Sequence, residues 1–177
     1  MPQASRLFAF TSWILKAGMI FCLAIVSILV LGLGALVLAE IGTIHIPIPE
    51  SVTHGMPLGE VLAAGALVIA AGAICMALYA LVLMLVGRIV DSAMAENPFV
   101  PKNANRLNAI GIVLLVLQGV GFFTRLAIFA MPQPLNQNLH IGFGMSLSGL
   151  FAALLVFVLA QIFHHGADMR AELEGTI

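Results

Sequence analysis

The sequence predicts an all-α membrane protein: a bundle of four transmembrane helices with both termini in the cytoplasm and a small cap formed by an outer loop. The first observation is composition. Of the 177 residues, 62% are hydrophobic and 8% are charged, whereas soluble domains carry about 25% charged residues. The second is that the apolar residues form four runs, each near the roughly 20 residues needed to cross a hydrocarbon core. The third is that Lys and Arg fall on alternate sides of these runs. We therefore expect residues 1–177 to form a single transmembrane domain.

The four runs are the predicted transmembrane spans, at about residues 17–39, 61–87, 109–131 and 141–163. The first is longer than the hydrophobic region of a signal peptide, which has about 7–15 residues. We therefore expect an uncleaved anchor, although Val37–Ala39 fits a cleavage site. Proline cannot continue a helix but suits its first turn. The second helix should accordingly extend to Asn97-Pro98 and the third begin near Pro101, while the fourth should continue towards Glu174.

The orientation follows from the basic residues, because cytoplasmic loops of membrane proteins are enriched in Lys and Arg. The N-terminal segment, the middle loop and the tail hold Arg6, Lys16, Arg88, Lys102, Arg106 and Arg170. The connections 40–60 and 132–140 hold none. Both termini are therefore expected in the cytoplasm. In the first outer connection isoleucine alternates with histidine or proline over Ile44–Pro49, which favours a short edge strand that serves as a cap.

Small residues repeat on single faces of two predicted helices. The second span carries Ala66, Ala70, Ala73, Ala77 and Ala80, and the fourth carries Gly142, Ser146, Gly149 and Ala153. Small side chains let membrane helices approach closely. Packing within one bundle is the favoured interpretation, and an interface of a homo-oligomer stays open as the alternative.

Arg125 is the one ionised residue inside a predicted span, and it shares a helix face with Gln118. An arginine at the centre of a membrane helix costs about 2.5–3.5 kcal/mol on insertion scales, so it usually has a partner. Glu40 and Glu60 lie at the outer ends of the first two spans, at nearly the same predicted depth. We hypothesise an ion pair between Arg125 and one of them. The alternatives are snorkelling and an intramembrane polar site for an anion, a lipid headgroup or a small molecule, as in a transporter subunit.

The sequence shows no signature of catalysis, metal binding or nucleic-acid binding. It contains no nucleophile elbow, phosphate loop or pair of carboxylates inside a span, so we do not expect an enzyme. The five histidines lack the spacing of a zinc site, and we expect neither a metal nor a cofactor. A net charge of −1 without a basic cluster argues against direct nucleic-acid binding. Cys22 and Cys75 lie at different depths, so we expect free thiols.

Two predicted cytoplasmic stretches carry a resemblance to a known family. The middle loop, residues 97–111, reads NPFVPKNANRLNAIG, and the tail, residues 163–177, reads FHHGADMRAELEGTI. They resemble the Pro-Phe-Val…Asn…Arg-Leu…Ile-Gly loop and the Glu-Leu-x-Gly-Thr-Ile ending of the YoaS-like bacterial integral membrane family, catalogued as domain of unknown function 2975. Met169 stands where the family more often has leucine, a change that conserves volume.

The resemblance implies a small protein of the bacterial inner membrane with no established activity, often encoded beside a helix-turn-helix transcription regulator. Together with the composition, it favours a regulatory or protein-interaction component that works through its cytoplasmic loop and tail. The candidate contacts for a cytoplasmic protein partner are Phe99, Asn103, Arg106, Glu172, Glu174 and Ile177. The rival interpretation is a small-molecule or lipid-binding protein, or a transporter subunit, that uses Gln118 and Arg125.

Overall fold

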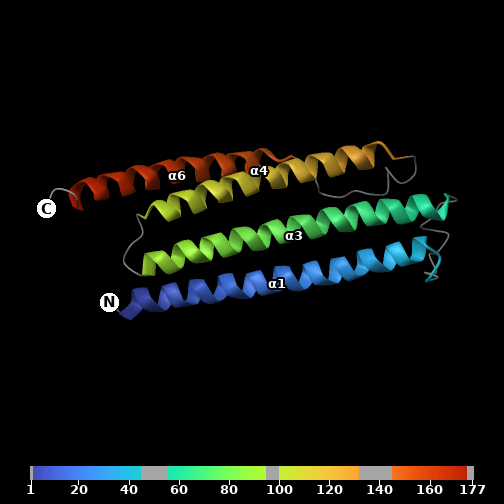
Figure 1. The fold of residues 1–177 in the computed structure, drawn as a ribbon, viewed down its shortest axis with the longest axis horizontal. Coiled ribbons are helices and arrows are strands. Elements are labelled where there is room, and N and C mark those ends of the chain that lie inside the picture. The colour runs from blue at the N-terminus through green and yellow to red at the C-terminus, as the bar shows by residue number, and fades with distance from the viewer. Residues whose placement is uncertain (1, 45–55, 95–99, 132–144, 175–177) are drawn as a thin grey trace.

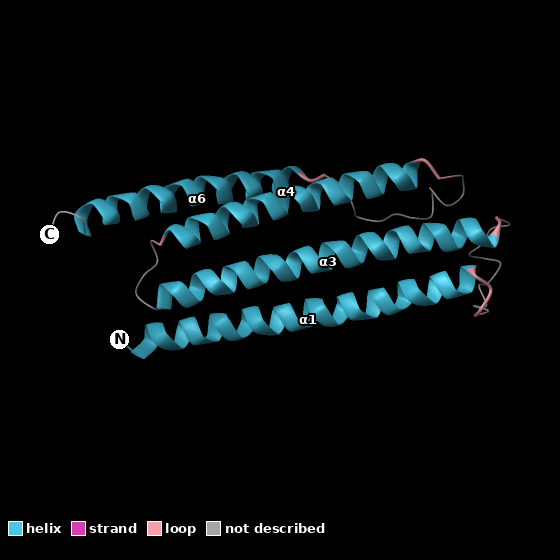
Figure 2. Ribbon diagram, viewed as in Figure 1, coloured by secondary structure: helices cyan, strands magenta, loops and turns pink. Residues whose placement is uncertain are grey.

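The computed structural model describes residues 2–44, 56–94, 100–131 and 145–174, and these form four long helices (Figures 1 and 2). In chain order they are α1 (Pro2–Glu40), α3 (Leu58–Met94), α4 (Pro101–Phe129) and α6 (Leu147–Glu174). All four are long and apolar enough to cross a membrane. The described residues contain no strand. The predicted all-α fold with four transmembrane helices is therefore confirmed, and the chain is a multi-pass membrane protein.

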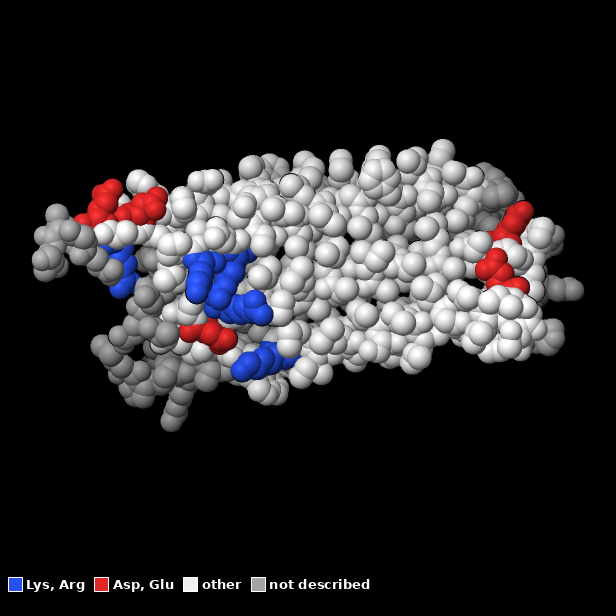
Figure 3. All heavy atoms as spheres, in the orientation of Figure 1, with Lys and Arg blue, Asp and Glu red and all other residues white. Residues whose placement is uncertain are grey.

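The helices form two antiparallel pairs, α1 with α3 and α4 with α6, which are joined where α3 packs on α4 (Figure 1). Both termini lie at one end of the molecule, which we call the terminal end. Charged side chains gather at the two ends of the face seen in Figure 3 and leave a long uncharged belt between them. A belt of this kind matches the apolar core of a bilayer.

Local chemistry fixes the helix boundaries. Helix α1 ends in a Schellman motif, in which Gly42 has φ 80° and the Thr43 N–H donates to the Leu38 carbonyl at 3.0 Å. Helix α4 begins at Pro101, as predicted, after Val100 in an extended conformation. The fourth helix begins at Leu147 and not at Ile141. The reason is that the Ser146 hydroxyl accepts a hydrogen bond from the Gly149 N–H at 3.1 Å, and so caps the helix there.

The α1–α3 pair packs through glycines that the small-residue analysis did not single out. A side chain at Gly65 would contact Leu36, and one at Gly72 would contact Leu29. Gly65 and Gly72 are seven residues apart on α3, as Leu29 and Leu36 are on α1, and seven residues is the repeat of a coiled-coil seam. The predicted alanine stripe of the second span only partly follows the packed surface, because Ala80 is buried whereas Ala77 is exposed.

Helix α4 is one of the two inner helices of the bundle, since it packs against both α3 and α6. Its residues Leu107 and Ile110 form a core with Ala160 of α6, and side chains of α3 pack against the same core. The buried alanines of α6 recur at seven-residue steps, at Ala153, Ala160 and Ala167. The described members of the predicted α6 stripe, Ser146, Gly149 and Ala153, accordingly lie on the side that packs against α4.

Two further predictions concern the cysteines and the outer cap. Cys22 and Cys75 are both free thiols, as predicted. The predicted cap strand at Ile44–Pro49 falls almost wholly outside the described residues, as do Phe99, Gly142 and Ile177.

Candidate functional site

A polar network joins the last turns of α3 to the first turn of α4. Asn103 lies at its centre with none of its surface exposed. Its side-chain amide donates to the Ser92 hydroxyl, and its amide oxygen accepts from Arg106 Nη1 at 2.9 Å. The Ser92 hydroxyl in turn donates to the Ile89 carbonyl at 2.8 Å. Because buried polar groups are stable only when hydrogen-bonded, this network fixes one geometry for the two helix ends.

Arg106 extends the network back to α3. The same Nη1 atom donates to the carbonyl oxygen of Arg88 at 2.8 Å. One guanidinium therefore holds α3 and α4 together on either side of their connection. Asn103 and Arg106 are both predicted partner contacts, and the structure brings them together. Asn103 is fully buried, however, so it supports the surface and does not itself lie on it. Ser92 was not among the predicted site residues. The sequence feature that could have identified it is a hydroxyl side chain in the last turns of a largely apolar helix.

The end of α6 projects beyond its neighbour α4. His164 and Asn105 line one small polar cleft and so lie at the same level. From there α6 continues for ten residues to Glu174, about 15 Å, whereas α4 reaches back only four residues to Pro101, about 6 Å. The tip of α6 therefore extends about 9 Å beyond the start of α4. In Figure 1 the C-terminal end of α6 likewise lies beyond the start of α4.

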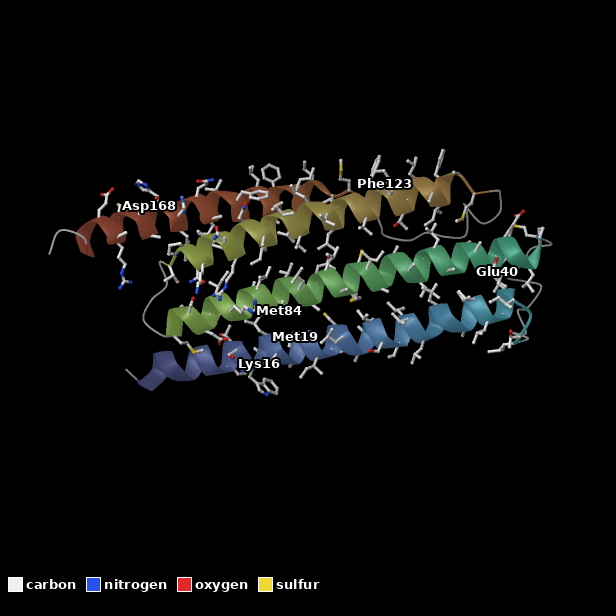
Figure 4. All side chains as sticks on the ribbon, viewed as in Figure 1. Lys16, Met19, Glu40, Met84, Phe123 and Asp168 are labelled. Carbon is white, nitrogen blue, oxygen red and sulfur yellow. The ribbon has the colours of Figure 1, made fainter. Side chains whose placement is uncertain are left out.

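The projecting segment carries an exposed, mixed surface. Asp168, labelled in Figure 4, lies 3.9 Å from His164 Nε2, and both side chains are exposed. Met169 is 51% exposed, and Glu172 is exposed as well. Ala167, at the base of this segment, is buried. Among the nominated tail residues, Glu172 thus lies on this surface. Glu174 is placed only as the last residue of the helix, and Ile177 is outside the described residues.

Gln118 joins α4 to the beginning of α6. Its side-chain oxygen accepts a hydrogen bond from the backbone N–H of Ser146 at 2.8 Å. The Gln118 amide occupies the space where a side chain at position 149 would lie, so Gly149 allows this contact. Gln118 is eleven residues, about 16 Å, from the end of α4. Helix α6 therefore begins about 16 Å short of the end of α4, at the level of the apolar part of the bundle, where a backbone N–H group in a membrane needs a protein partner.

Arg125 does not pair with Glu40 or Glu60, and the ion-pair hypothesis is wrong. No described carboxylate lies within salt-bridge distance of its exposed guanidinium. One reason is depth: Arg125 follows Thr124, which shares a groove with Ala70, and this level is ten residues or about 15 Å from Glu60. The other is direction, because α4 presents Gln118 and Arg125, seven residues apart, away from α3 and α1. Figure 4 shows Glu40 at the far end of the α1–α3 pair.

An apolar groove of about 610 Å³ lies between α3 and α4 in the half of the molecule away from the termini. Its α4 wall includes Val116, Val120 and Phe123. The Thr124 hydroxyl on this wall donates to the Val120 carbonyl at 2.7 Å and so presents no free donor. The groove is lined by the face of α4 that is turned to α3, whereas Gln118 lies on the face that is turned to α6. The groove and the Gln118–Arg125 stripe are therefore separate surfaces.

Residues that could hold a metal do not gather in the part of the chain that the structure describes. That part contains no group of three or more His, Cys, Asp and Glu side chains suited to an ion. His164 and His165 both lie on the exposed surface of α6. The remaining histidines, His45, His54 and His140, lie outside the described residues.

A family model described as a protein of unknown function (DUF2975) matches residues 43–177. This match covers three of the four helices and includes both the middle loop and the tail. The chain belongs to the DUF2975 family. The resemblance of those two stretches is thereby confirmed, and the polar network and the projecting end of α6 both lie within the matched region. Comparisons of this DUF2975 protein with curated proteins and with solved structures found no match.

Proposed function

We propose that this DUF2975 protein is a non-catalytic component of the bacterial inner membrane that binds a cytoplasmic protein on the projecting end of α6. In this proposal both termini are cytoplasmic, as the distribution of Lys and Arg predicts. The α3–α4 connection, in which Phe99 is a predicted contact, forms the rest of the proposed docking face.

The observation that carries the proposal is the projection of α6 by about 9 Å beyond the start of α4. A helix that served only to cross the bilayer could end level with its neighbours. The projecting turns instead continue in helical form with charged side chains and the exposed Met169. Methionine is enriched in the apolar core of protein interfaces, and polar side chains form their rim.

The Asn103–Arg106 network supports the same proposal. It holds the ends of α3 and α4 in one geometry beside the projecting helix, through hydrogen bonds of 2.8 and 2.9 Å. A rigid surface loses less conformational entropy on binding than a mobile one. The nature of the partner comes from the resemblance alone: family members are often encoded beside a helix-turn-helix regulator, so a regulator of this kind is the partner we propose.

Co-sedimentation of the purified regulator with lipid nanodiscs tests this proposal. The nanodiscs would carry the full chain, a chain ending at Ala167, or the full chain with Met169→Asp. Ending at Ala167 keeps the buried side of α6 and removes only its projecting turns. We expect the two altered chains to bind at least tenfold more weakly, and Leu154→Ala, which changes an exposed residue of the apolar part of α6, to bind normally. Equal binding by the chain that ends at Ala167 would contradict the proposal.

The second candidate function is that of a small-molecule or lipid-binding protein, or a transporter subunit, that uses Gln118 and Arg125. The exposure of Arg125 favours it, because this guanidinium has no described carboxylate beside it. The hydrogen bond of Gln118 to the start of α6 favours a structural role for that residue instead. The two candidate functions depend on different residues. Substitution of Arg125 should abolish the binding of a small molecule or lipid and leave the binding of the regulator intact.

A further inference from the structure

A second surface lies at the terminal end, in a cleft between α1 and α3 of about 150 Å³. Helix α1 contributes four side chains to it and α3 contributes the rest. The lining residues are Ser12, Leu15, Lys16, Met19, Leu83, Met84, Gly87, Arg88 and Asp91. The docking face proposed above does not include this cleft.

Three charged side chains line the cleft without neutralising one another. Lys16, Arg88 and Asp91 all border it and are all exposed. Among the residues that the structure describes, none of these three forms an ion pair within 4.0 Å. In Figure 3 basic and acidic side chains alternate on this part of the surface. The cleft therefore presents two cations and one anion to whatever enters it.

The polarity of the lining changes along the cleft. Towards the terminal end it is polar, with Ser12, Lys16 and Asp91, and towards the middle of the molecule it is apolar, with Met19 and Met84. Figure 4 shows Met19 and Met84 on the two facing helices, with Lys16 nearer the terminal end. The distance along α3 from Asp91 to Met84 is seven residues, about 10 Å. A phospholipid has the same sequence of chemistry, from a charged headgroup to an acyl chain.

Gly87 keeps the cleft open. It lies between the polar and the apolar part of the lining, and a side chain at this position would meet nothing within 4 Å. By contrast, a side chain at Gly18 of the same helix pair would meet Leu83 at 3.3 Å. The space beside Gly87 is thus available to a ligand, and a larger side chain at this position would extend into the cleft.

We propose that this cleft binds one phosphatidylethanolamine molecule from the adjoining leaflet. The phosphate lies between Lys16 and Arg88, and the ammonium group lies at Asp91. One acyl chain follows Met19 and Met84. Basic pockets between transmembrane helices are known to bind lipid phosphates. Asp91 determines the choice of lipid, because a carboxylate attracts the ammonium of phosphatidylethanolamine and has no cationic partner in phosphatidylglycerol.

The test is native mass spectrometry of the full chain released from nanodiscs that contain equal amounts of phosphatidylethanolamine and phosphatidylglycerol. We expect the chain to retain one phosphatidylethanolamine. Lys16→Gln or Arg88→Gln should weaken retention about tenfold, as expected for the loss of a charge-assisted contact. Gly87→Leu should abolish it. Asp91→Asn should retain both lipids equally.

Matched controls separate this site from general attraction of lipid to charge. Lys102→Gln removes an exposed cation of α4 outside the cleft, and Asp168→Asn removes an exposed acid of α6. Both should retain phosphatidylethanolamine like the unaltered chain. Retention that survives Gly87→Leu, or that falls equally with Lys102→Gln, would overturn the proposal. So would an unaltered chain that prefers phosphatidylglycerol, or one that retains neither lipid.

Discussion

The Asn103 network allows a quantitative prediction about stability. Replacing Asn103 with alanine removes the hydrogen bond that it accepts from Arg106 and the one that it donates to Ser92. A bond to a charged group contributes about 1.5–3 kcal/mol and a neutral one about 1 kcal/mol, although measured values for bonds between membrane helices average about 0.6 kcal/mol. Because Arg106 is only half-buried, we take the lower values. The expected loss in free energy of unfolding is about 2 kcal/mol.

The assay is reversible unfolding in mixed micelles by titration with a denaturing detergent. Asn105→Ala is the matched control, because Asn105 is an exposed asparagine two positions further along the same helix turn, and it should cost less than about 0.5 kcal/mol. A double-mutant cycle of Asn103→Ala with Arg106→Gln should show a coupling of about 1 kcal/mol. A loss no greater than that of the control, or a coupling near zero, would refute the network as a stabilising element.

Three further predictions concern α4. Gly111→Ala would bring a methyl group within 2.7 Å of the Phe157 ring. Overpacking of this kind costs about 1–3 kcal/mol, whereas replacing a glycine inside a helix gains about 1 kcal/mol. Thermal unfolding should therefore show a net loss of stability of about 1 kcal/mol. Gln118→Leu leaves the Ser146 N–H without its acceptor, which should cost about 1–2 kcal/mol in the same assay. Arg125→Gln should leave the unfolding temperature unchanged, because the exposed guanidinium forms no ion pair with a described carboxylate.

Gly119→Ala provides the control for these substitutions, since a side chain there meets nothing within 4 Å. It should be neutral or slightly stabilising. Equal behaviour of Gly111→Ala and Gly119→Ala would mean that the Phe157 contact is not tight. A clear loss of stability with Arg125→Gln would mean that this residue has a structural partner.

The sequence was sufficient to predict the four helices and several of their ends. Length and hydropathy indicate a span because few other structures bury about 20 apolar residues in succession. Pro101 marks the beginning of α4 because proline suits the first turn of a helix. The beginning of α6 was missed by six residues. Apolar content continues through Ile141–Met145, whereas the helix begins where the Ser146 hydroxyl caps it, and hydropathy does not detect a cap.

The lateral contacts of the helices could not be predicted in the same way. The hydropathy runs placed Arg125 and Glu60 at nearly the same depth, whereas their levels differ by about 15 Å. Position along the chain also does not say which neighbour each helix face meets. The same limit applies to the small-residue stripes: the spacing identified alanines on α3, whereas the glycines that face the other helix of the α1–α3 pair include Gly18, Gly65 and Gly72. Asn103 and Arg106 were found from a family-like loop, yet their hydrogen bonds to Ser92 and to the Arg88 carbonyl depend on the approach of α3 to α4.

The central claim is that the projecting end of α6 binds a cytoplasmic protein, and photocrosslinking in living cells tests it most directly. A photoreactive amino acid would replace Met169 on the projecting turns, and Leu155, an exposed residue of the apolar part of α6, in a control chain. The account predicts an adduct with the helix-turn-helix regulator from position 169 and only lipid adducts from position 155. Adducts from position 169 with lipid alone, or with a second copy of this chain alone, would contradict it.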